Sequence, residues 1–323
     1  MKINYRLIKL LFIINILIII NFVFNKRYIN INNHLTDIKD YNHDFDINFD
    51  FIHYENYIIT EKMKKEAGWI LTQEQTEFIN GIIRKMKPNN CLEIGVARGG
   101  SSILILNAIK DFPNSKLVSL DLHNKFKRNE TIGYRVKKYF PELSKKWNLF
   151  SGNMPHIILS KLKQKFDFVF LDTAHISPGE IINFIEILPF LNENAIVVLH
   201  DIEWHYHQVL NPNSKFFKTK IMPTQIYLMS VIHGDKIIPR NKLKEFFNIG
   251  AIYLSKNQKE NYLNYFLLLM TVWEYMPTDI QLNSLRDFIV KYYNDEILVK
   301  IFDNSVYYNK KFFANINNTT FGN

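Results

Sequence analysis

The stretch from Cys91 to Ser102, CLEIGVARGGSS, constrains the fold of this chain more than any other. An apolar, strand-like run passes there through a glycine-rich turn into a helix. Gly95 and Gly99 allow a tight turn and a close approach of the backbone to a ligand, and Ser101 begins a helix whose free amides face the turn. The pattern is typical of a cradle for a nucleotide-type cofactor, although a purely structural turn would look the same.

The chemistry beside this turn narrows the choice of ligand. Glu93 places a carboxylate next to the loop, which favours a cationic or hydroxyl-bearing ligand over a pyrophosphate, and neither G-x-G-x-x-G nor the P-loop lysine pattern is present. The next predicted strand, Lys116 to Asp121, ends in an acid roughly twenty residues beyond the glycines, where dinucleotide-type folds place a ribose-binding carboxylate. An ordinary strand-end aspartate is the alternative for Asp121.

The segment from Phe166 to Asp201 repeats the alternation of strand and helix. An apolar strand from Phe168 to Leu171 leads into Asp172-Thr-Ala-His175, and Ala195 to Leu199 leads into His200-Asp201. The helix between them starts at Pro178-Gly179, with Glu180, Asn183 and Glu186 predicted to face outward. Alternating strands and helices predict a parallel sheet whose ligands lie at the carboxyl ends of the strands.

Five motifs between Leu92 and Asp201 occur in a characteristic order: LEIGVARGGSS, VSLD, FSGNMP, FDFVFLDTAH and AIVVLHD. In this order they resemble the class I S-adenosylmethionine-dependent methyltransferases. The resemblance is closest to small-molecule and sugar O-methyltransferases that carry Asp-x-x-His after the fourth strand and His-Asp after the fifth. Ala97 departs from the commonest loop, which has glycine, but fits this subgroup.

The resemblance implies an α/β fold with a doubly wound, mostly parallel sheet, and S-adenosylmethionine as the cofactor. Adenine contacts are implied for Gly152, Asn153 and Met154. The full set of expected cofactor-binding residues is Glu93, Gly95, Arg98, Gly99, Ser101, Asp121, Gly152, Asn153, Met154 and Asp172.

A divalent metal is a second expectation at the same edge of the sheet. Asp172 and Asp201 should close neighbouring strands, and their carboxylates suit a cation such as Mg²⁺. In related metal-dependent O-methyltransferases aspartates at these strand ends hold the metal, which implies Asp172 and Asp201 here. At the third position those enzymes have another carboxylate or amide, whereas this chain has His200, our candidate for the third ligand. Nitrogen ligation suits Zn, Fe or Mn better than Mg²⁺, and His200 and Asp201 converge only if the strand has already broken, so the metal stays open.

His175 is the candidate general base, with Asp172 as its catalytic neighbour, because methyl transfer to a hydroxyl requires removal of a proton that imidazole can take near neutral pH. A helix-capping role is the alternative for His175. The predicted activity is O-methylation of a small hydroxylated acceptor, such as a sugar of a glycan. A metal-dependent oxygenase with Fe(II) on His175, His200 and one aspartate is a rival, as is a non-catalytic, membrane-tethered cofactor-binding module.

The N-terminal residues 1–29 form a separate region. Their apolar run, Leu10 to Phe24, is flanked by basic residues and predicts a membrane anchor, with a core helix or an interfacial helix as alternatives. Because the methyl donor is a cytoplasmic metabolite, we expect the catalytic domain to face the cytoplasm, although positive charge is somewhat heavier before the run. Residues 30–60, rich in Asn and Asp, read as a linker.

The net charge and the cysteine count of the chain limit its possible partners and its disulfide bonds. The net charge of +9 comes from scattered lysines, which favours a solvated surface over an acidic partner. No dense basic-aromatic patch or amino-methylating N/D-P-P-Y signature suggests a nucleic acid. Cys91 is the only cysteine, so no intramolecular disulfide is possible.

The methyltransferase domain is predicted over residues 61–255 and a helical extension over 256–323. Capping boxes at Thr72 to Gln75 and Thr278 to Gln281 each predict a helix start. We also expect a helix from Thr224 to Ile232, a late antiparallel strand from Asn248 to Leu254 and a buried helix from Asn261 to Tyr275. The extension could cover the acceptor pocket or hold a second subunit in a homo-oligomer, and the tail after Asn315 is predicted to fray.

Overall fold

The computed structural model describes residues 62, 63, 65, 71–126, 130–173, 175–203, 224–239 and 248–320. The chain divides into two compact units, Met1–Phe51 and Ile52–Asn323, and the described residues all belong to the second. The predicted anchor and linker therefore lie outside the described residues. Within the described ranges, no helix combines the length and the apolar character that a bilayer crossing requires.

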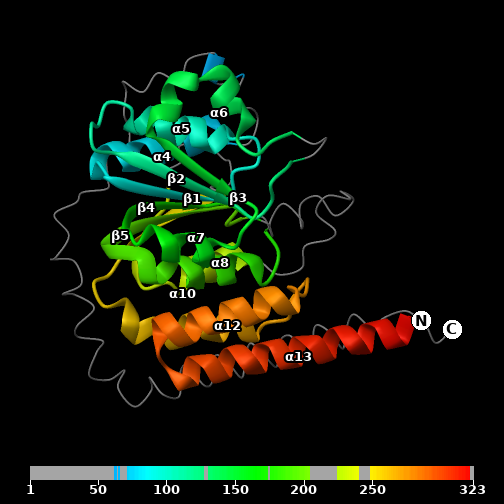
Figure 1. Cartoon of the computed structure of the whole chain (residues 1–323). Coiled ribbons are helices and arrows are strands. Elements are labelled where there is room, and N and C mark those ends of the chain that lie inside the picture. The colour runs from blue at the N-terminus through cyan, green and yellow to red at the C-terminus, as the bar shows by residue number, and fades with distance from the viewer. Residues whose placement is uncertain are drawn as a thin grey trace. The chain divides into compact units, whose positions relative to one another are not determined.

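The sheet has the predicted doubly wound, mostly parallel architecture. Its described strands run in the order β3-β2-β1-β4-β5-β7-β6 (Figure 1). The first five are parallel, whereas β7 is antiparallel to both β5 and β6. The strands are β1 (Asn90–Ile94), β2 (Lys116–Asp121), β3 (Trp147–Ser151), β4 (Phe166–Leu171), β5 (Leu191–His200), β6 (Gly234–Ile237) and β7 (Ile249–Leu254).

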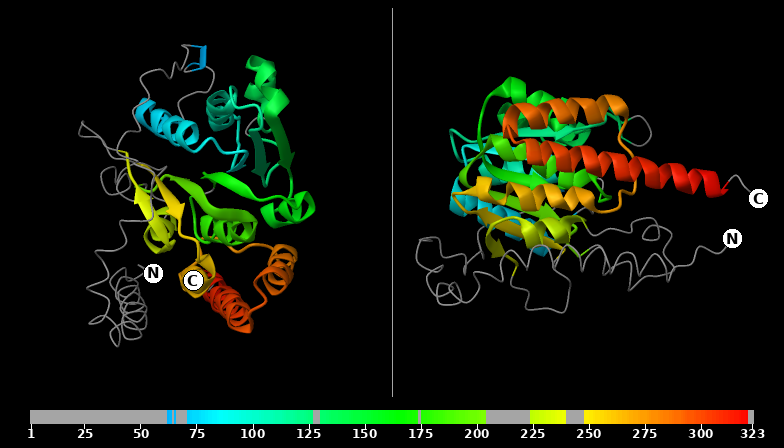
Figure 2. Two further views of the ribbon diagram at one scale, coloured as in Figure 1. Left: turned by 90° about the vertical axis from the view of Figure 1, so that its left-hand side faces the viewer. Right: turned by 90° about the horizontal axis from the view of Figure 1, so that it is seen from below.

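Helices cover both faces of the sheet, and a further layer of helices lies beyond one of them (Figures 1 and 2). One face carries α4 (Gln73–Met86), α5 (Gly100–Ile109) and α6 (Tyr134–Tyr139). The opposite face carries α7 (Pro155–Leu162), α8 (Gly179–Ile187) and α10 (Thr224–Val231). The further layer consists of α11 (Tyr262–Leu267), α12 (Asp279–Tyr293) and α13 (Glu296–Thr320).

Both predicted capping boxes are present and set the starts of α4 and α12. Thr72 accepts from the backbone N–H of Gln75 while the Gln75 side chain accepts from the Thr72 N–H, and Thr278 and Gln281 do the same. These reciprocal bonds satisfy two of the donors that a helix start leaves free. The local sequence therefore determined these two boundaries.

The segment from Asn261 to Tyr275 differs from the single buried helix that we predicted. The helix α11 ends at Leu267, a 3-10 turn covers Leu268–Met270, and the chain is irregular from Thr271. Asn309 of α13 explains the break, because its Oδ1 accepts from the Trp273 N–H at 2.8 Å and its Nδ2 donates to the Thr271 carbonyl at 3.3 Å. The long helix α13 was itself not predicted, and it continues past Asn315, where we expected fraying.

Two glutamates of α8 that were predicted to face solvent are instead buried, with no exposed surface. Glu180 accepts from the hydroxyls of Thr173 and Thr224 and from the backbone N–H of His175. Glu186 bonds to His156 and Asn183. A buried charge requires such partners, and most of them come from other elements, so helical periodicity alone could not reveal them.

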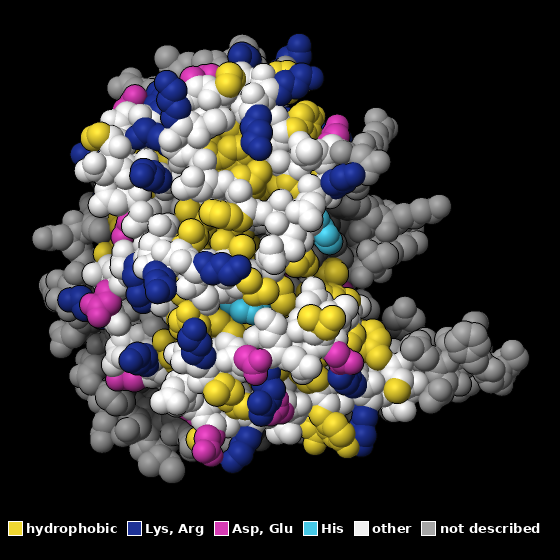
Figure 3. Space-filling view, in the orientation of Figure 1, with side chains coloured by type: hydrophobic (Ala, Val, Ile, Leu, Met, Phe, Trp, Pro, Cys, Tyr) yellow, Lys and Arg dark blue, Asp and Glu magenta, His cyan; other side chains and the backbone are white. Residues whose placement is uncertain are grey.

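The C-terminal helices share one hydrophobic core with the sheet. Phe166 at the start of β4, Phe184 of α8, Phe288 of α12 and Phe302 of α13 belong to one buried cluster. The surface is mixed: on the face shown in Figure 3, the Lys and Arg side chains are spread out rather than gathered in one patch. This distribution agrees with the interpretation of the net positive charge as a solvated surface.

Candidate active site

A cavity of about 520 Å³ lies at the carboxyl ends of β1, β2, β4 and β5. The chain order of the strands reverses between β1 and β4, the kind of crevice in which doubly wound sheets bind ligands. Its wall includes five predicted cofactor residues, namely Gly95, Ser101, Asp121, Met154 and Asp172, together with His175, His200 and Asp201. The fold thus brings sequence motifs more than one hundred residues apart to one site.

The two glycines of the loop allow other parts of the protein to pack closely against the backbone of the loop. Gly95 has φ +91°, and a Cβ there would lie 1.8 Å from the carbonyl oxygen of Asp172. Gly99 has φ +90°, and a Cβ there would lie 3.1 Å from atoms of Gly133 and Val136. Gly95 also lines the cavity, but Gly99 does not, so at Gly99 glycine is required by packing rather than by an approaching ligand.

Glu93, expected to contact the cofactor, lies beneath the loop instead. Its carboxylate accepts from the hydroxyls of Ser101, Ser102 and Ser119, each at 2.6 Å, and its side chain has no exposed surface. Burial raises the pKa of Glu93 to about 7, although the three serine hydrogen bonds oppose the shift. Glu93 is absent from the cavity wall, and in this structure it joins β1, β2 and α5.

Asp121 lies on the cavity wall at the end of β2, as predicted. Its Oδ2 accepts from the backbone N–H groups of Val96 and Ala97 at 3.1 and 3.0 Å, and its Oδ1 accepts from the N–H of His123 at 2.9 Å. A carboxylate has about four lone-pair sites, which leaves one for a ligand hydroxyl. Asp121 thus holds the loop and keeps capacity for a ribose.

Of four other predicted cofactor residues, only one lines the cavity. Arg98 donates to Glu130 at 2.9 Å, and with Gly152 and Asn153 it is absent from the cavity wall. Gly152 has φ +84°, a left-handed backbone conformation that favours glycine without any ligand contact. Met154 alone of the four faces the cavity.

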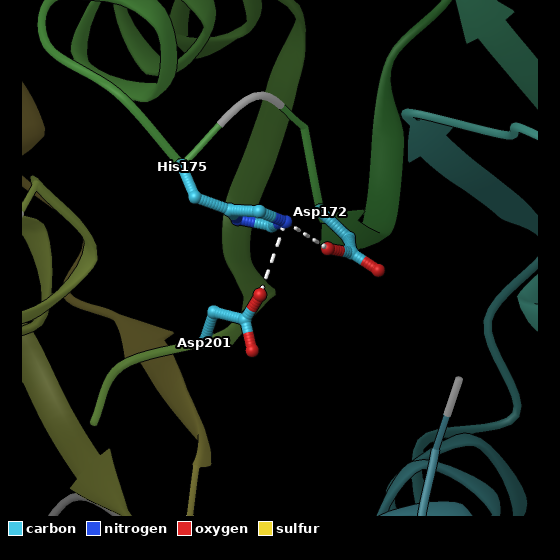
Figure 4. A group of neighbouring side chains, drawn as sticks. All are labelled: Asp172, His175 and Asp201. Atoms are coloured by element: carbon cyan, nitrogen blue, oxygen red, sulfur yellow. Dashed lines mark ion pairs between the residues drawn. The ribbon is translucent and has the colours of Figure 1, made fainter. Parts of the chain in front are cut away.

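His175, Asp172 and Asp201 form a compact group at the ends of β4 and β5 (Figure 4). The Nε2 atom of His175 lies 3.0 Å from Oδ2 of Asp201 and 3.5 Å from Oδ1 of Asp172. One ligand atom from each residue lies within 4.8 Å of the other two. The strand has broken at this point, because β5 ends at His200 and Asp201 has φ +59°.

His200, which we expected as the third metal ligand, is not a member of this compact group. Its Nδ1 lies 3.2 Å from Oδ1 of Asp172 and 3.6 Å from Oδ1 of Asp201. Burial disfavours its charged form, but the two carboxylates more than offset this and raise the pKa of His200 to about 9. The two carboxylates thus favour the charged form of His200, which offsets part of their negative charge.

Several residues of this site were not found from the sequence. Gln225 of α10 places its side-chain amide 3.0 Å from Nδ1 of His175. Asn183 and Glu186 of α8 line the cavity, as do Tyr275, Pro277 and Gln281 from the C-terminal extension. The capping box identified Gln281 as a helix start, but no local pattern could place it at the cavity.

The fold and this crevice are those of a cofactor-binding α/β domain, and comparison with known proteins specifies its class. Residues 92–202 match a family model described as a methyltransferase domain. This match agrees with the resemblance of the motifs to the class I S-adenosylmethionine-dependent methyltransferases. The expected cofactor is S-adenosylmethionine.

Solved structures and one curated relative show further similarities. The structure of Podospora anserina methyltransferase PaMTH1 with bound S-adenosylhomocysteine shares 17% sequence identity with this chain at a TM-score of 0.46. The alignment covers 61% of this chain and 89% of PaMTH1. The Streptomyces achromogenes O-methyltransferase TomG, involved in tomaymycin synthesis, is also 17% identical with a TM-score of 0.45, covering 61% and 90%. Protein Ycf2 of Ipomoea purpurea is 25% identical over 186 residues, which are 56% of this chain and only 7% of Ycf2.

Proposed function

We propose that the protein transfers a methyl group from S-adenosylmethionine to a hydroxyl group of a small acceptor. The observation that carries the proposal is the imidazole of His175, which shares one cavity with the glycine loop and lies 3.0 Å from a carboxylate oxygen of Asp201. A sugar of a glycan is the first acceptor class to test. The comparisons give no support to an oxygenase or to a non-catalytic binding module.

His175 supplies the proton chemistry in this proposal. Methyl transfer from a sulfonium is an in-line displacement in which the protein positions two reactants, and the acceptor oxygen gives up its proton as the new bond forms. The proton passes to Nε2 of His175, and Asp201 and Asp172 stabilise the resulting imidazolium. Glu180 positions the base, because its carboxylate accepts from the backbone N–H of His175.

The hydrogen bonds at Nδ1 of His175 permit an imidazole whose Nε2 carries the lone pair. Thr224 has a single hydroxyl hydrogen for two acceptors, Glu180 at 2.9 Å and the Gln225 side chain at 3.0 Å, and the charged acceptor makes the stronger bond. If Thr224 donates to Glu180, a half-turn of the Gln225 amide lets its nitrogen donate to Thr224 and its oxygen accept from Nδ1–H of His175. The lone pair of His175 then resides on Nε2, whereas the carboxylate oxygen of Asp201, 3.0 Å away, favours a hydrogen on this atom. The base form of His175 therefore requires the acceptor hydroxyl to replace Asp201 as the partner of Nε2.

The same three residues fit a divalent cation, because two carboxylate oxygens and one imidazole nitrogen converge within 4.8 Å. Asp172, His175 and Asp201 would hold the ion, and the nitrogen donor suits Mn²⁺, Zn²⁺ or Fe²⁺ better than Mg²⁺. Such an ion would lower the pKa of an acceptor hydroxyl. Nε2 of His175 cannot bind a metal ion and accept a proton at the same time. An experiment can therefore separate the role of His175 as a metal ligand from its role as a general base.

Replacing His175 tests the proposed base. We expect His175→Ala to lower methyl transfer to the best acceptor of a sugar panel by about 10²- to 10⁴-fold and to leave the affinity for S-adenosylhomocysteine unchanged. Turnover of labelled S-adenosylmethionine and calorimetric titration provide the two readouts. His233→Ala, at a histidine that does not line the cavity, is the control and should retain activity.

Two outcomes of this experiment would contradict the role of His175: full activity of the variant, or loss of cofactor binding without loss of folding. Direct binding of Mn²⁺, followed by electron paramagnetic resonance, separates the two roles of the group. Tight Mn²⁺ binding that is lost in both His175→Ala and Asp201→Asn identifies His175 as a ligand rather than a base. Mn²⁺ binding that does not depend on His175 leaves it as the base.

A further inference from the structure

We propose that Asn183 of α8 and Gln281 of α12 bind the purine edge of the cofactor, so that the C-terminal extension completes the cofactor site. This inference rests on S-adenosylmethionine as the cofactor. Both residues line the cavity, and Gln281 lies far outside the matched methyltransferase segment 92–202.

The position of these residues corresponds to the base end of the cavity. Asp121 at the end of β2 is the candidate ribose ligand. From Asp121 the cavity continues past the neighbouring strand β3, which leaves room there for the base of a nucleoside. The residues that follow β3 on the cavity wall are Met154 and Pro155. His156 comes next and joins this wall to the other two helices, because it lies 2.6 Å from Glu186 of α8 and 2.8 Å from Ser284 of α12.

The hydrogen-bond partners of Asn183 and Gln281 determine which end of each side-chain amide is the oxygen and which is the nitrogen. Asn183 donates through Nδ2 to a carboxylate oxygen of Glu186 at 3.0 Å, and a carboxylate only accepts. Gln281 accepts through Oε1 from the backbone N–H of Thr278 at 2.9 Å, and an N–H only donates. Asn183 therefore has its carbonyl oxygen, and Gln281 its amino group, left for a ligand. Among the described residues, none bonds to either of these two groups.

One acceptor and one donor match the edge of adenine. The 6-amino group of adenine donates a hydrogen bond, and the adjacent ring nitrogen N1 accepts one. Hypoxanthine has the reverse arrangement, with a carbonyl oxygen at position 6 and a hydrogen on N1. A wall formed by Asn183 and Gln281 should therefore prefer an adenosyl cofactor over its deaminated analogue.

The capping box allows a substitution that changes the ligand chemistry of Gln281 and retains the fold. Glutamate also serves at this position of a capping box, so Gln281→Glu keeps the acceptor for Thr278 and removes the amino donor. The second capping box supplies a matched control, because Gln75→Glu makes the same change at the start of α4, where the residue does not line the cavity.

The experiment is calorimetric titration of the full chain and both variants with S-adenosylhomocysteine and with S-inosylhomocysteine. We expect Gln281→Glu to weaken S-adenosylhomocysteine binding about tenfold and to reduce the preference for it over the inosine analogue, because the new carboxylate accepts from N1–H. We expect Gln75→Glu to leave the affinity and the preference unchanged. Thermal unfolding of each variant verifies that α4 and α12 remain folded.

The possible results are distinct. Unchanged affinity and preference in a folded Gln281→Glu variant would overturn the proposal and leave Gln281 as a helix cap only. An equal loss for both ligands would also overturn it, because a purine-edge contact must discriminate between them. Failure of the unsubstituted protein to bind S-adenosylhomocysteine would instead remove the cofactor assignment on which the proposal rests.

Discussion

At the scale of single residues, burial changed the roles that the sequence suggested. Glu93 has the spacing of a ligand-binding acid, yet its buried carboxylate accepts from three serine hydroxyls beneath the loop. Ser101 and Ser102 are adjacent in sequence to the turn, but Ser119 reaches Glu93 only because β2 pairs with β1. Pairing between strands is not visible in a local motif, which explains why Glu93 was assigned to the cofactor.

Glu93 also predicts a pH dependence of stability. Its pKa of about 7 in the folded state exceeds the ordinary value of 4.5, so the folded protein binds more protons than the unfolded chain between these values. The free energy of unfolding therefore falls as pH rises from 4.5 through 7, by at most about 3 kcal/mol from this group. We expect Glu93→Gln to flatten this dependence in urea unfolding at pH 5 and pH 7.5. An identical difference between the two pH values in both proteins would contradict the assignment.

At the scale of secondary structure, local signals located the starts of helices and the ends of strands, whereas contacts between elements decided which faces are buried. The helix α12 begins at its predicted capping box, and its apolar positions Leu285, Phe288 and Ile289 are buried. The helix α8 has an equally clear pattern, but two of its acids are buried by partners from other segments. Periodicity therefore predicts an apolar face reliably but does not reveal a buried charge.

Tyr293 tests how α12 is attached to α8. It is buried, and its hydroxyl donates to the backbone carbonyl of Ile185 at 2.6 Å. We expect Tyr293→Phe to lower the free energy of unfolding by about 1 kcal/mol, because the substitution removes one buried hydrogen bond and keeps the ring. Tyr292→Phe is the matched control and should change stability by less than about 0.5 kcal/mol. Equal effects of the two substitutions in chemical denaturation would refute this attachment.

At the scale of the whole described domain, the C-terminal layer belongs to the same core as the sheet. Phe302 of α13 is 1% exposed and lies in the cluster that contains β4 and β5 residues. The division at residue 255 in the predicted domain organisation therefore falls within a continuous core. A continuous core implies that the sheet and the last three helices unfold together.

Substitution of Phe302 measures this coupling. We expect Phe302→Ala to lower the free energy of unfolding of the whole domain by about 3 to 5 kcal/mol, in one transition that also abolishes cofactor binding. Phe312→Ala on the same helix, at a side chain that is 41% exposed, should have little effect. A Phe302→Ala variant that keeps the transition of the sheet and loses only helical signal would show that the C-terminal layer is independent.

The sequence by itself determined the alternation of strands and helices between Leu92 and Asp201, the glycine-rich turn, the two capping boxes and the carboxylates at the strand ends. These features depend on short-range backbone and side-chain preferences, which a local pattern records. Only the tertiary structure decided that His175 forms the compact group with Asp172 and Asp201, that the carboxylate of Glu93 is buried against three serines, and that Gln281 lines the cavity. Each of these depends on a contact between segments far apart in the chain, and such contacts arise only when the sheet and its helices pack into one core.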